Sequence, residues 1–389
     1  MPTIRKRSDT YQIRVSAGYD GAGKQLIQSM TWRPAPGMTP KQVKKELDRQ
    51  SVLFEEKVKN GQMADGAIKF SVFADLWFKE HAEKQLAAKT THEYHKLWKR
   101  IEPAVGNLRL DKLQPIHFQR LYSNLAEAGM NLKTGGVLSP STIKHYHAML
   151  SSMLNMAVLW GYLPISPLRV RPPKQGSKQG RYLDETQVLA LLAALEDEPI
   201  QYKSMIYALI YTGMRKGELL GLEWNDLDFN NQLIHIERAS QYIPRQGVIT
   251  KEPKNKTSQR VIKAPSALFD MLSALKQNQL VLRMQAGDQW QDTGRLFTRW
   301  NGAALHPDTL PKWFRRFLRR YDLPYINIHG LRHTNASLLI AEHVDIRTVA
   351  GRLGHANTST TLNLYAHQLQ SADVAASDAL EIALALKPG

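Results

Sequence analysis

The chain of 389 residues contains no cysteine. This absence excludes disulfide bonds, thiol catalysis and cysteine-ligated zinc sites, and it is compatible with a reducing cytosol. No apolar run reaches the roughly 18 to 20 residues that a membrane span needs. The first residues are basic, but they are not followed by the apolar core of a secretory signal. We therefore expect a cytoplasmic protein that has no membrane partner.

Acidic residues are scarce relative to basic ones. The 35 aspartates and glutamates stand against 52 lysines and arginines, so the formal net charge is +17. An excess of this size favours a polyanionic partner, with nucleic acid as the first candidate. The alternative is a generically basic soluble protein. Hydrophobic residues make up 43% of the sequence, which supports a sizeable core and, at this length, two or three domains.

Residues 1–66 are predicted to form a small sheet and one helix. Tyr11, Ile13 and Val15 alternate with polar neighbours, which is the period of a strand with one buried face. A glycine-containing turn and a second alternating stretch follow, and Thr39 is a good N-cap for a helix. The basic residues predicted to contact DNA in this region are Arg5, Lys6, Arg7 and Arg14. A small basic sheet can lay one face into a DNA groove, and the alternative is a solubilising addition.

Residues 67–168 change to the helical period, and four or five amphipathic helices predict an all-α domain. Residues 169–181 combine prolines, glycines and basic residues without an acidic one, which indicates an extended interdomain linker. Arg171 and Lys174 in this linker are predicted to follow a DNA phosphate backbone. A solvated run of charge is the alternative.

Residues 182–389 are predicted to form a third domain that mixes helices with a few strands. Asp184 is a candidate helix cap, and helical patterns stand on both sides of Gly213. Strand patterns follow, and helices dominate again after Ser266. The predicted fold is therefore mainly α with small β elements, organised in three domains.

Two motifs of this last region combine arginine with groups that can orient it or move protons. In TGMRKGELLGLEW, Arg215 lies three residues before Glu218, which can hold its guanidinium on a helix. In IHGLRHT, His329 and Arg332 share a helix face, and a proton carrier beside a fixed cation suits a phosphate under attack. His329 and His333 have the spacing of half a zinc-protease motif, but its glutamate is missing and Arg332 disfavours a dication. We therefore predict no metal site.

Two further motifs complete the set. The stretch EPKNKTSQRVI is a predicted basic hairpin that carries Lys254 and Lys256. The stretch LGHANTSTTLNLYAH carries His355 and, ten residues later, Tyr365. Each motif alone is weak, because helix ion pairs, solvated lysines and core tyrosines are common.

The order of these motifs, however, resembles the tyrosine recombinases, also called phage-type integrases. The resemblance covers the catalytic half of the chain, from about residue 180 to about residue 370. The helical region resembles the core-binding domain of this family, and the first sheet resembles the arm-binding domain of integrases from phages and conjugative transposons. The agreement comprises five features in order, namely Arg215 in TGMRKGE, the hairpin lysine, the stretch HGLRHT, the stretch LGH and Tyr365, and we do not expect it by chance.

The resemblance implies a role for each motif residue. Tyr365 matches the nucleophile that attacks a DNA phosphodiester and forms a 3′-phosphotyrosyl link. Arg215 and Arg332 match the pair that clamps the scissile phosphate, and His355 matches a further phosphate ligand. His329 matches the residue that handles the proton of the nucleophile.

The general acid that protonates the departing 5′-oxygen matches Lys254, with Lys256 as the alternative. The family pattern of Ser and Arg four and six residues later favours Lys254, because Ser258 and Arg260 then agree. Lys256 is then a DNA contact. Glu218 and Asp226 match supporting acidic positions.

The resemblance also implies the partners and leaves rival functions open. It implies double-stranded DNA with core and arm sites, a homotetramer on that DNA, and a bacterial cytosol. DNA-bending and excision proteins are possible accessory partners. The C-terminal segment is expected to dock on a neighbouring protomer or on its own domain. Ester exchange conserves bond energy, so no ATP is expected. Two guanidiniums and an imidazole can stabilise the charge that a metal ion stabilises elsewhere, so no metal or other cofactor is expected. The rivals are a type IB topoisomerase and a non-catalytic DNA-binding protein of the same fold.

Overall fold

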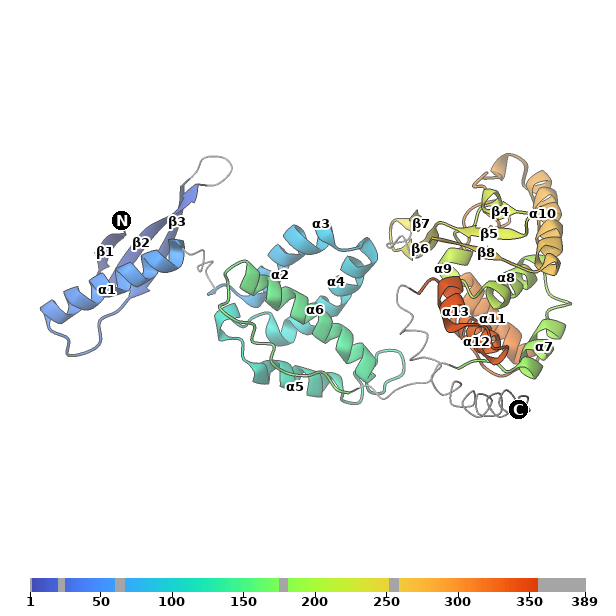
Figure 1. Cartoon of the computed structure of the whole chain (residues 1–389). Helices are drawn as coiled ribbons and strands as arrows, with labels where there is room; N and C mark the ends of the chain where they lie inside the picture. The colour runs from blue at the N-terminus through green and yellow to red at the C-terminus, as the bar shows by residue number, and fades with distance from the viewer. Residues whose placement is uncertain (1, 20–24, 60–66, 175–180, 252–258, 356–389) are drawn as a thin grey trace, which may run out of the picture. The chain divides into compact units, whose positions relative to one another are not determined.

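The computed structural model describes residues 2–19, 25–59, 67–174, 181–251 and 259–355. The chain divides into two compact units, residues 1–176 and 177–389. Figure 1 draws the described residues in colour and the others in grey. The described residues are mostly helical and contain three small antiparallel sheets, as the sequence predicted. None of the helices in this described part combines the length and apolar character needed to cross a membrane.

The first unit begins with a three-stranded sheet backed by one helix. The strands are β1 (Thr3–Arg7), β2 (Thr10–Tyr19) and β3 (Gln25–Trp32), and the helix is α1 (Pro40–Lys59). A reciprocal pair of bonds between Thr39 and Gln42 caps α1, as the sequence predicted. The core between the sheet and α1 contains Ile13, Val15, Leu47, Phe54 and Val58.

The strand register separates the predicted DNA contacts of this sheet onto its two faces. Thr3 pairs with Arg14 and Ile4 with Ile13, so Arg5, Arg7 and Arg14 share the face opposite buried Ile13. Lys6 lies on the same face as Ile4, and all four basic residues are exposed. Three of the four therefore present one open basic face.

The helices of the first unit surround a second core. They are α2 (Phe70–Trp77), α3 (Glu83–Gln85), α4 (Ala88–Val105), α5 (Pro115–Leu125) and α6 (Pro140–Leu159). The predicted stripe of α6 is buried, and Ser139 caps it by accepting from the Thr142 amide. The core joins that stripe to Phe70, Phe73 and Trp77 of α2.

Two local features of these helices are not evident from the apolar pattern. The helix that begins at Phe70 is interrupted by a π-helical turn, Phe78–Ala82, which buries both end residues of the turn. A wide turn of this kind shifts the helix face, and the apolar pattern alone does not reveal it. Helix α4 continues through Pro103 to Val105, although a proline usually marks the end of a helix.

The second unit places helices around two small sheets. The helices are α7 (Glu185–Ala194), α8 (Ile200–Thr212), α9 (Lys216–Leu219), α10 (Ser266–Ala286), α11 (Thr309–Arg320), α12 (Ile328–Ala341) and α13 (Ile346–Leu353). The first sheet contains β4 (Leu227–Asp228), β5 (Leu233–Ile236) and β8 (Arg260–Lys263), and the second contains β6 (Ala239–Ile243) and β7 (Gly247–Lys251). Asp184 caps α7, as the sequence predicted. One large core joins helices α7 through α12 to the sheet of β4, β5 and β8, and a separate small cluster packs Val349 and Leu353 of α13 against Ala336 of α12.

The predicted linker lies partly outside the described residues. Arg171 and Lys174 precede the gap and are exposed, as a DNA contact requires. The predicted domain limits at residues 66, 168 and 181 stay a prediction.

Candidate active site

Arg215 is presented by a sharp turn between α8 and α9. Gly213 ends α8 in the left-handed conformation, with φ of 63°. A Cβ atom at this position would lie 2.6 Å from both Asn335 Oδ1 and Leu353 Cδ2, so glycine is required for conformation and for space. The turn leaves Arg215 as the N-cap of α9, with its side chain 40% exposed.

Glu218 holds Arg215 in place, as the sequence predicted. Its carboxylate is buried and accepts three bonds, from the Arg215 amide at 2.8 Å, from Arg215 Nη1 at 2.7 Å and from Arg260 Nη2 at 2.8 Å. Burial alone would raise the pKa of Glu218, but the hydrogen bond and charge of Arg260 and the bonds from Arg215 outweigh it, so the pKa is lowered. The alternative of a weak surface ion pair is therefore wrong.

The helix α12 carries the second arginine and the first histidine. The Asn327 side chain caps α12 by accepting from the Gly330 amide at 2.9 Å, and His329 lies in the first turn. Arg332 follows one turn later and is 3% exposed. Its Nη1 donates to the Gly213 carbonyl at 2.8 Å, which ties α12 to the turn that presents Arg215.

The motif LGH ends α13 and turns the chain toward Arg215. Gly354 adopts φ of 68° after buried Leu353, and His355 leaves the helix directly after it. Arg215 Nη2 donates to the Gly354 carbonyl at 3.1 Å, and Arg260 Nε donates to the Arg352 carbonyl at 2.6 Å. Arg260 therefore joins the start of β8, the buried Glu218 and the turn that carries His355.

The imidazoles of this region resist protonation. Burial, followed by the charges of Arg332 and Arg215, lowers the pKa of His355 to about 4 and also lowers the pKa of His329. The ring of His333 packs edge-on against that of His329, with 4.9 Å between centroids. The histidines are thus neutral at pH 7, so His329 is able to accept a proton.

Four of the six predicted catalytic residues converge: Arg215, His329, Arg332 and His355. The remaining two, Lys254 and Tyr365, lie outside the described residues, as does Lys256. Sequence reasoning named Arg260 as part of a pattern but missed its contacts, because its partners are remote in sequence. No cluster of metal-ligating side chains occurs in the described part of the chain.

Replacing Glu218 by Gln is expected to lower the free energy of unfolding at pH 7 by about 3 kcal/mol, because two guanidiniums then face a neutral amide in a buried site. The pKa of Glu218 is lowered in the folded chain, so its contribution is present above about pH 4.3 and is lost as the pH falls through the folded pKa. Denaturant unfolding at pH 7 and at pH 3 should show the difference narrowing in acid.

The matched control is Glu196→Gln. Glu196 is exposed and pairs with Lys203 at the surface, so its replacement should cost less than about 1 kcal/mol. Equal losses for Glu218→Gln and Glu196→Gln would contradict a special role for the buried carboxylate.

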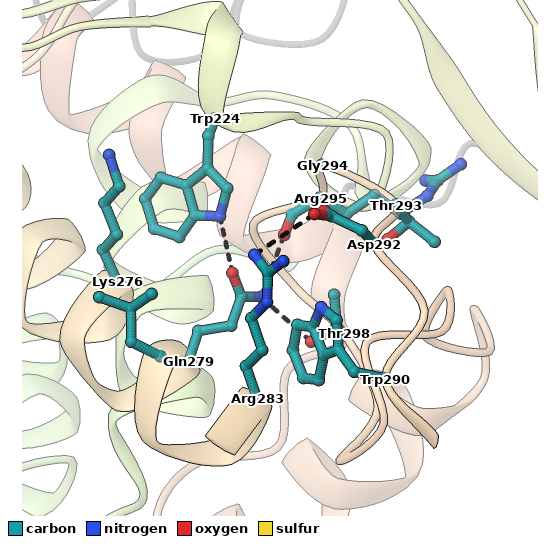
Figure 2. A pocket seen from close by; sticks show the side chains of 11 residues that line it. Trp224, Lys276, Gln279, Arg283, Trp290, Asp292, Thr293, Gly294, Arg295 and Thr298 are labelled. Atoms are coloured by element: carbon teal, nitrogen blue, oxygen red, sulfur yellow. Dashed lines mark hydrogen bonds and ion pairs between the residues drawn. The ribbon is translucent and has the colours of Figure 1, made fainter. Parts of the chain in front are cut away.

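A cavity of about 140 Å³ lies between α10 and the loop after it (Figure 2). Two tryptophans and several basic residues line it, and an Arg283–Asp292 ion pair of 3.3 Å lies at its edge. Its lining includes Arg295 but none of the four converging residues. We therefore assign the chemistry to the Arg215 cluster and not to this cavity.

Comparison with known proteins gives two profile matches. The Phage integrase family profile matches residues 181–371, and the profile of the phage integrase N-terminal SAM-like domain matches residues 69–126. The first match covers the whole converging cluster, and the second lies within the helical core of the first unit. Together they span well over half of the chain.

A relative and two solved structures agree with these matches. The tyrosine recombinase XerC-like protein of Caldanaerobacter subterraneus subsp. tengcongensis is 26% identical over 385 residues, which cover 94% of each chain. The Tn1549 transposon integrase in complex with circular intermediate DNA is 20% identical with a TM-score of 0.65, and the match covers 77% of this chain and 95% of that one. The lambda integrase tetramer bound to a Holliday junction is 15% identical with a TM-score of 0.57, and the match covers 93% and 94%.

Three observations agree with one another. They are the fold of both units, the convergence of Arg215, His329, Arg332 and His355, and the profile matches. They identify the basic, cysteine-free chain with enzymes that cleave and rejoin DNA strands. The chain belongs to the phage integrase family, the tyrosine recombinases.

Proposed function

We propose that the chain is a site-specific DNA recombinase whose scissile phosphate binds between Arg215, Arg332 and His355. The observation that carries this proposal is the convergence of these residues with His329 inside a phage integrase domain. Two guanidiniums stay charged at every relevant pH and offer paired donors to phosphate oxygens. A neutral imidazole adds a donor without raising the repulsion between cations.

The reaction exchanges one phosphate ester for another. The Tyr365 oxygen forms a bond to phosphorus, its proton passes to His329, and the bond between phosphorus and the 5′-oxygen breaks. The 5′-oxygen takes a proton from Lys254, which leaves a 3′-phosphotyrosyl link and a free 5′-hydroxyl. Attack by the 5′-hydroxyl of a second strand reverses these steps and joins the strands. Charge that builds on the non-bridging oxygens is stabilised by Arg215 and Arg332.

Further contacts position the DNA. The open basic face of the first sheet, with Arg5, Arg7 and Arg14, is proposed to bind arm sites. Lys6 lies on the other face of the sheet and is proposed to add positive charge near the DNA. Arg171, Lys174 and Lys256 are proposed to bind the backbone near the core site. We propose a homotetramer on paired sites, by analogy with the lambda integrase tetramer on a Holliday junction.

The biological setting follows from the same reaction. We propose that the chain acts in the bacterial cytosol, where it integrates a mobile element and excises it with the help of DNA-bending and excision proteins. The C-terminal segment, which lies outside the described residues, is proposed to dock on a neighbouring protomer.

The test is to trap and sequence the covalent adduct. The full chain is incubated with fragmented genomic DNA from its host, and protein-linked ends are captured and sequenced. We expect the adducts to share one short inverted repeat, and two plasmid copies of that repeat to recombine. Adducts at unrelated sequences, with rapid relaxation of plasmids that lack the repeat, would instead indicate a topoisomerase.

A further inference from the structure

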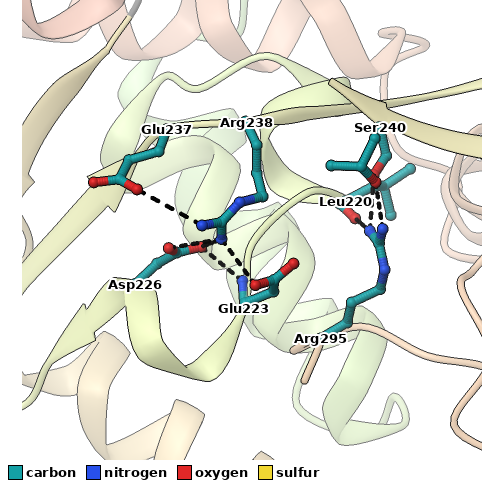
Figure 3. A network of polar contacts seen from close by, with 8 residues as sticks. Leu220, Glu223, Asp226, Glu237, Arg238, Ser240 and Arg295 are labelled. Carbon is teal, nitrogen blue, oxygen red and sulfur yellow. Dashed lines mark hydrogen bonds and ion pairs between the residues drawn. The ribbon is translucent and has the colours of Figure 1, made fainter. Parts of the chain in front are cut away.

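The hairpin β6–β7 is fastened to the rest of its unit by one arginine. Arg295 Nη1 donates to the Leu220 carbonyl at 2.8 Å and to Ser240 Oγ at 2.8 Å, and its Nη2 donates to Thr250 Oγ1 (Figure 3 draws Leu220, Ser240 and Arg295). Ser240 and Thr250 are cross-strand partners whose hydroxyl oxygens lie 2.9 Å apart. The Arg295 guanidinium therefore binds both strands of the hairpin and also Leu220, the residue that directly follows α9.

The backbone around this contact is closely packed. A Cβ atom on Gly217 would lie 3.1 Å from the Ser240 carbonyl oxygen, and one on Gly221 would lie 3.0 Å from the Arg238 carbonyl oxygen. Strand β6 thus runs directly over α9 and the turn after it. The Arg295 backbone is itself fixed, because its carbonyl accepts from Gln279 Nε2 on α10 at 3.1 Å.

A second arginine secures the base of the same hairpin. Arg238, which directly precedes β6, pairs with buried Asp226 at 2.7 Å and with Glu223 at 3.2 Å (Figure 3). Arg238 fixes where β6 begins, whereas Arg295 fixes how the middle of both strands lies against α9. The Arg295 contact also includes the Leu220 carbonyl, directly after α9, and the N-cap of α9 is Arg215.

This geometry links two parts of the proposed reaction. Arg215 is the N-cap of α9. Strand β7 ends at Lys251, and Lys254 follows three residues later in the sequence. Three residues span at most about 11 Å, so the direction in which β7 ends restricts where Lys254 can be placed. Because the Arg295 guanidinium holds β7 against the end of α9, it sets the position of the last residue of β7 relative to Arg215, which is proposed to bind the phosphate.

We propose that Arg295 is a positioning residue for DNA cleavage, which acts by holding β6–β7 against α9 so that the lysine following β7 reaches the leaving 5′-oxygen. The proposal rests on the proposed function and assigns no direct contact between Arg295 and DNA. It predicts a selective defect in leaving-group protonation, because the described hydrogen bonds that place Arg215 and Arg332 run to Glu218, Gly354 and Gly213, none of which belongs to β6 or β7.

A sulfur substitution isolates this step. In normal cleavage the bond between phosphorus and the 5′-oxygen breaks, and the oxygen takes a proton from Lys254. With sulfur in that bridging position, the bond between phosphorus and sulfur breaks and the electron pair leaves on a thiolate. A thiol has a pKa of about 8.5, whereas water has a pKa of about 15.7, so the thiolate departs without an acid. A defect confined to proton delivery disappears on this substrate.

The experiment compares single-turnover cleavage of the two substrates, each bearing the sequenced core site, by full-length variants. Arg295→Met should slow cleavage of the oxygen substrate about 100-fold. On the sulfur substrate, the cleavage rate of this variant should lie within a few-fold of the wild-type rate. Arg283→Met is the matched control, because it removes a cation and a surface ion pair from the same region without touching the hairpin. It should cleave both substrates at the wild-type rate.

Two more variants separate the possible failures. The double variant Ser240→Ala, Thr250→Val removes the two hydroxyl groups to which Arg295 donates. It should therefore reproduce the selective defect even if Arg295→Met folds poorly. Equal slowing on both substrates by these variants, or no slowing at all, would overturn the role of Arg295. Lys254→Ala should also be rescued by sulfur, and a lack of rescue there would refute Lys254 as the general acid. Rescue of Arg295→Met without rescue of Lys254→Ala would overturn the link between Arg295 and Lys254, because Arg295 would then act on a different proton donor.

Discussion

Replacing Tyr365 by Phe is expected to abolish the covalent protein–DNA adduct completely while leaving DNA affinity within about twofold of wild type. The substitution removes one oxygen, and with it the atom that bonds to phosphorus. None of the four described residues of the converging cluster carries a hydroxyl group, since the cluster consists of two guanidiniums and two imidazoles. DNA affinity depends on many cations, none of which is altered.

The measurement uses a nicked core-site duplex whose released end diffuses away, so that the adduct accumulates and resists denaturing electrophoresis. Tyr207→Phe is the matched control: its hydroxyl donates to Glu196 at 3.2 Å, and its loss should leave adduct formation unchanged. Adduct formation by Tyr365→Phe at any appreciable rate would mean that another residue is the nucleophile.

The convergence of four candidate residues could be predicted because the order of their motifs resembles one family, although each motif alone is weak. Local signals agree with it: Gly213 lies two residues before Arg215, Gly354 directly precedes His355, and both glycines adopt the left-handed conformation that ends a helix. The spacing of His329 and Arg332 on one helix is local too. Such signals act within a few residues, so a sequence displays them directly.

The supporting contacts could not be predicted in this way. Arg295 reaches Leu220, Ser240 and Thr250, which lie 75, 55 and 45 residues away along the chain. An isolated arginine near a turn carries no pattern that names such partners, because the fold alone brings them together. The π-helical turn Phe78–Ala82 was missed for a related reason, since an apolar stripe indicates burial but not the number of residues in each turn.

Substituting Arg332 by Lys is expected to reduce the rate of DNA cleavage about 1,000-fold, with a much smaller effect on DNA affinity. Lysine keeps the charge but replaces a planar fork of donors by a single ammonium group. In the structure, Arg332 is 3% exposed and one arm of its guanidinium already donates to the Gly213 carbonyl at 2.8 Å. The three donors of a lysine sit on one nitrogen, so they cannot span that carbonyl and a phosphate as the separate nitrogens of a guanidinium do.

The size of the effect follows from where negative charge develops. The phosphate gains charge on its non-bridging oxygens only as the attacking and leaving oxygens share the phosphorus, so a lost donor costs more in the transition state than in the bound substrate. Single-turnover cleavage and DNA affinity, measured on the same duplex, separate the two. Arg320→Lys is the control, because Arg320 is 57% exposed and a lysine can still pair with Glu198. If Arg332→Lys weakened binding as much as cleavage, Arg332 would act by attracting DNA and not by stabilising the pentacoordinate phosphate.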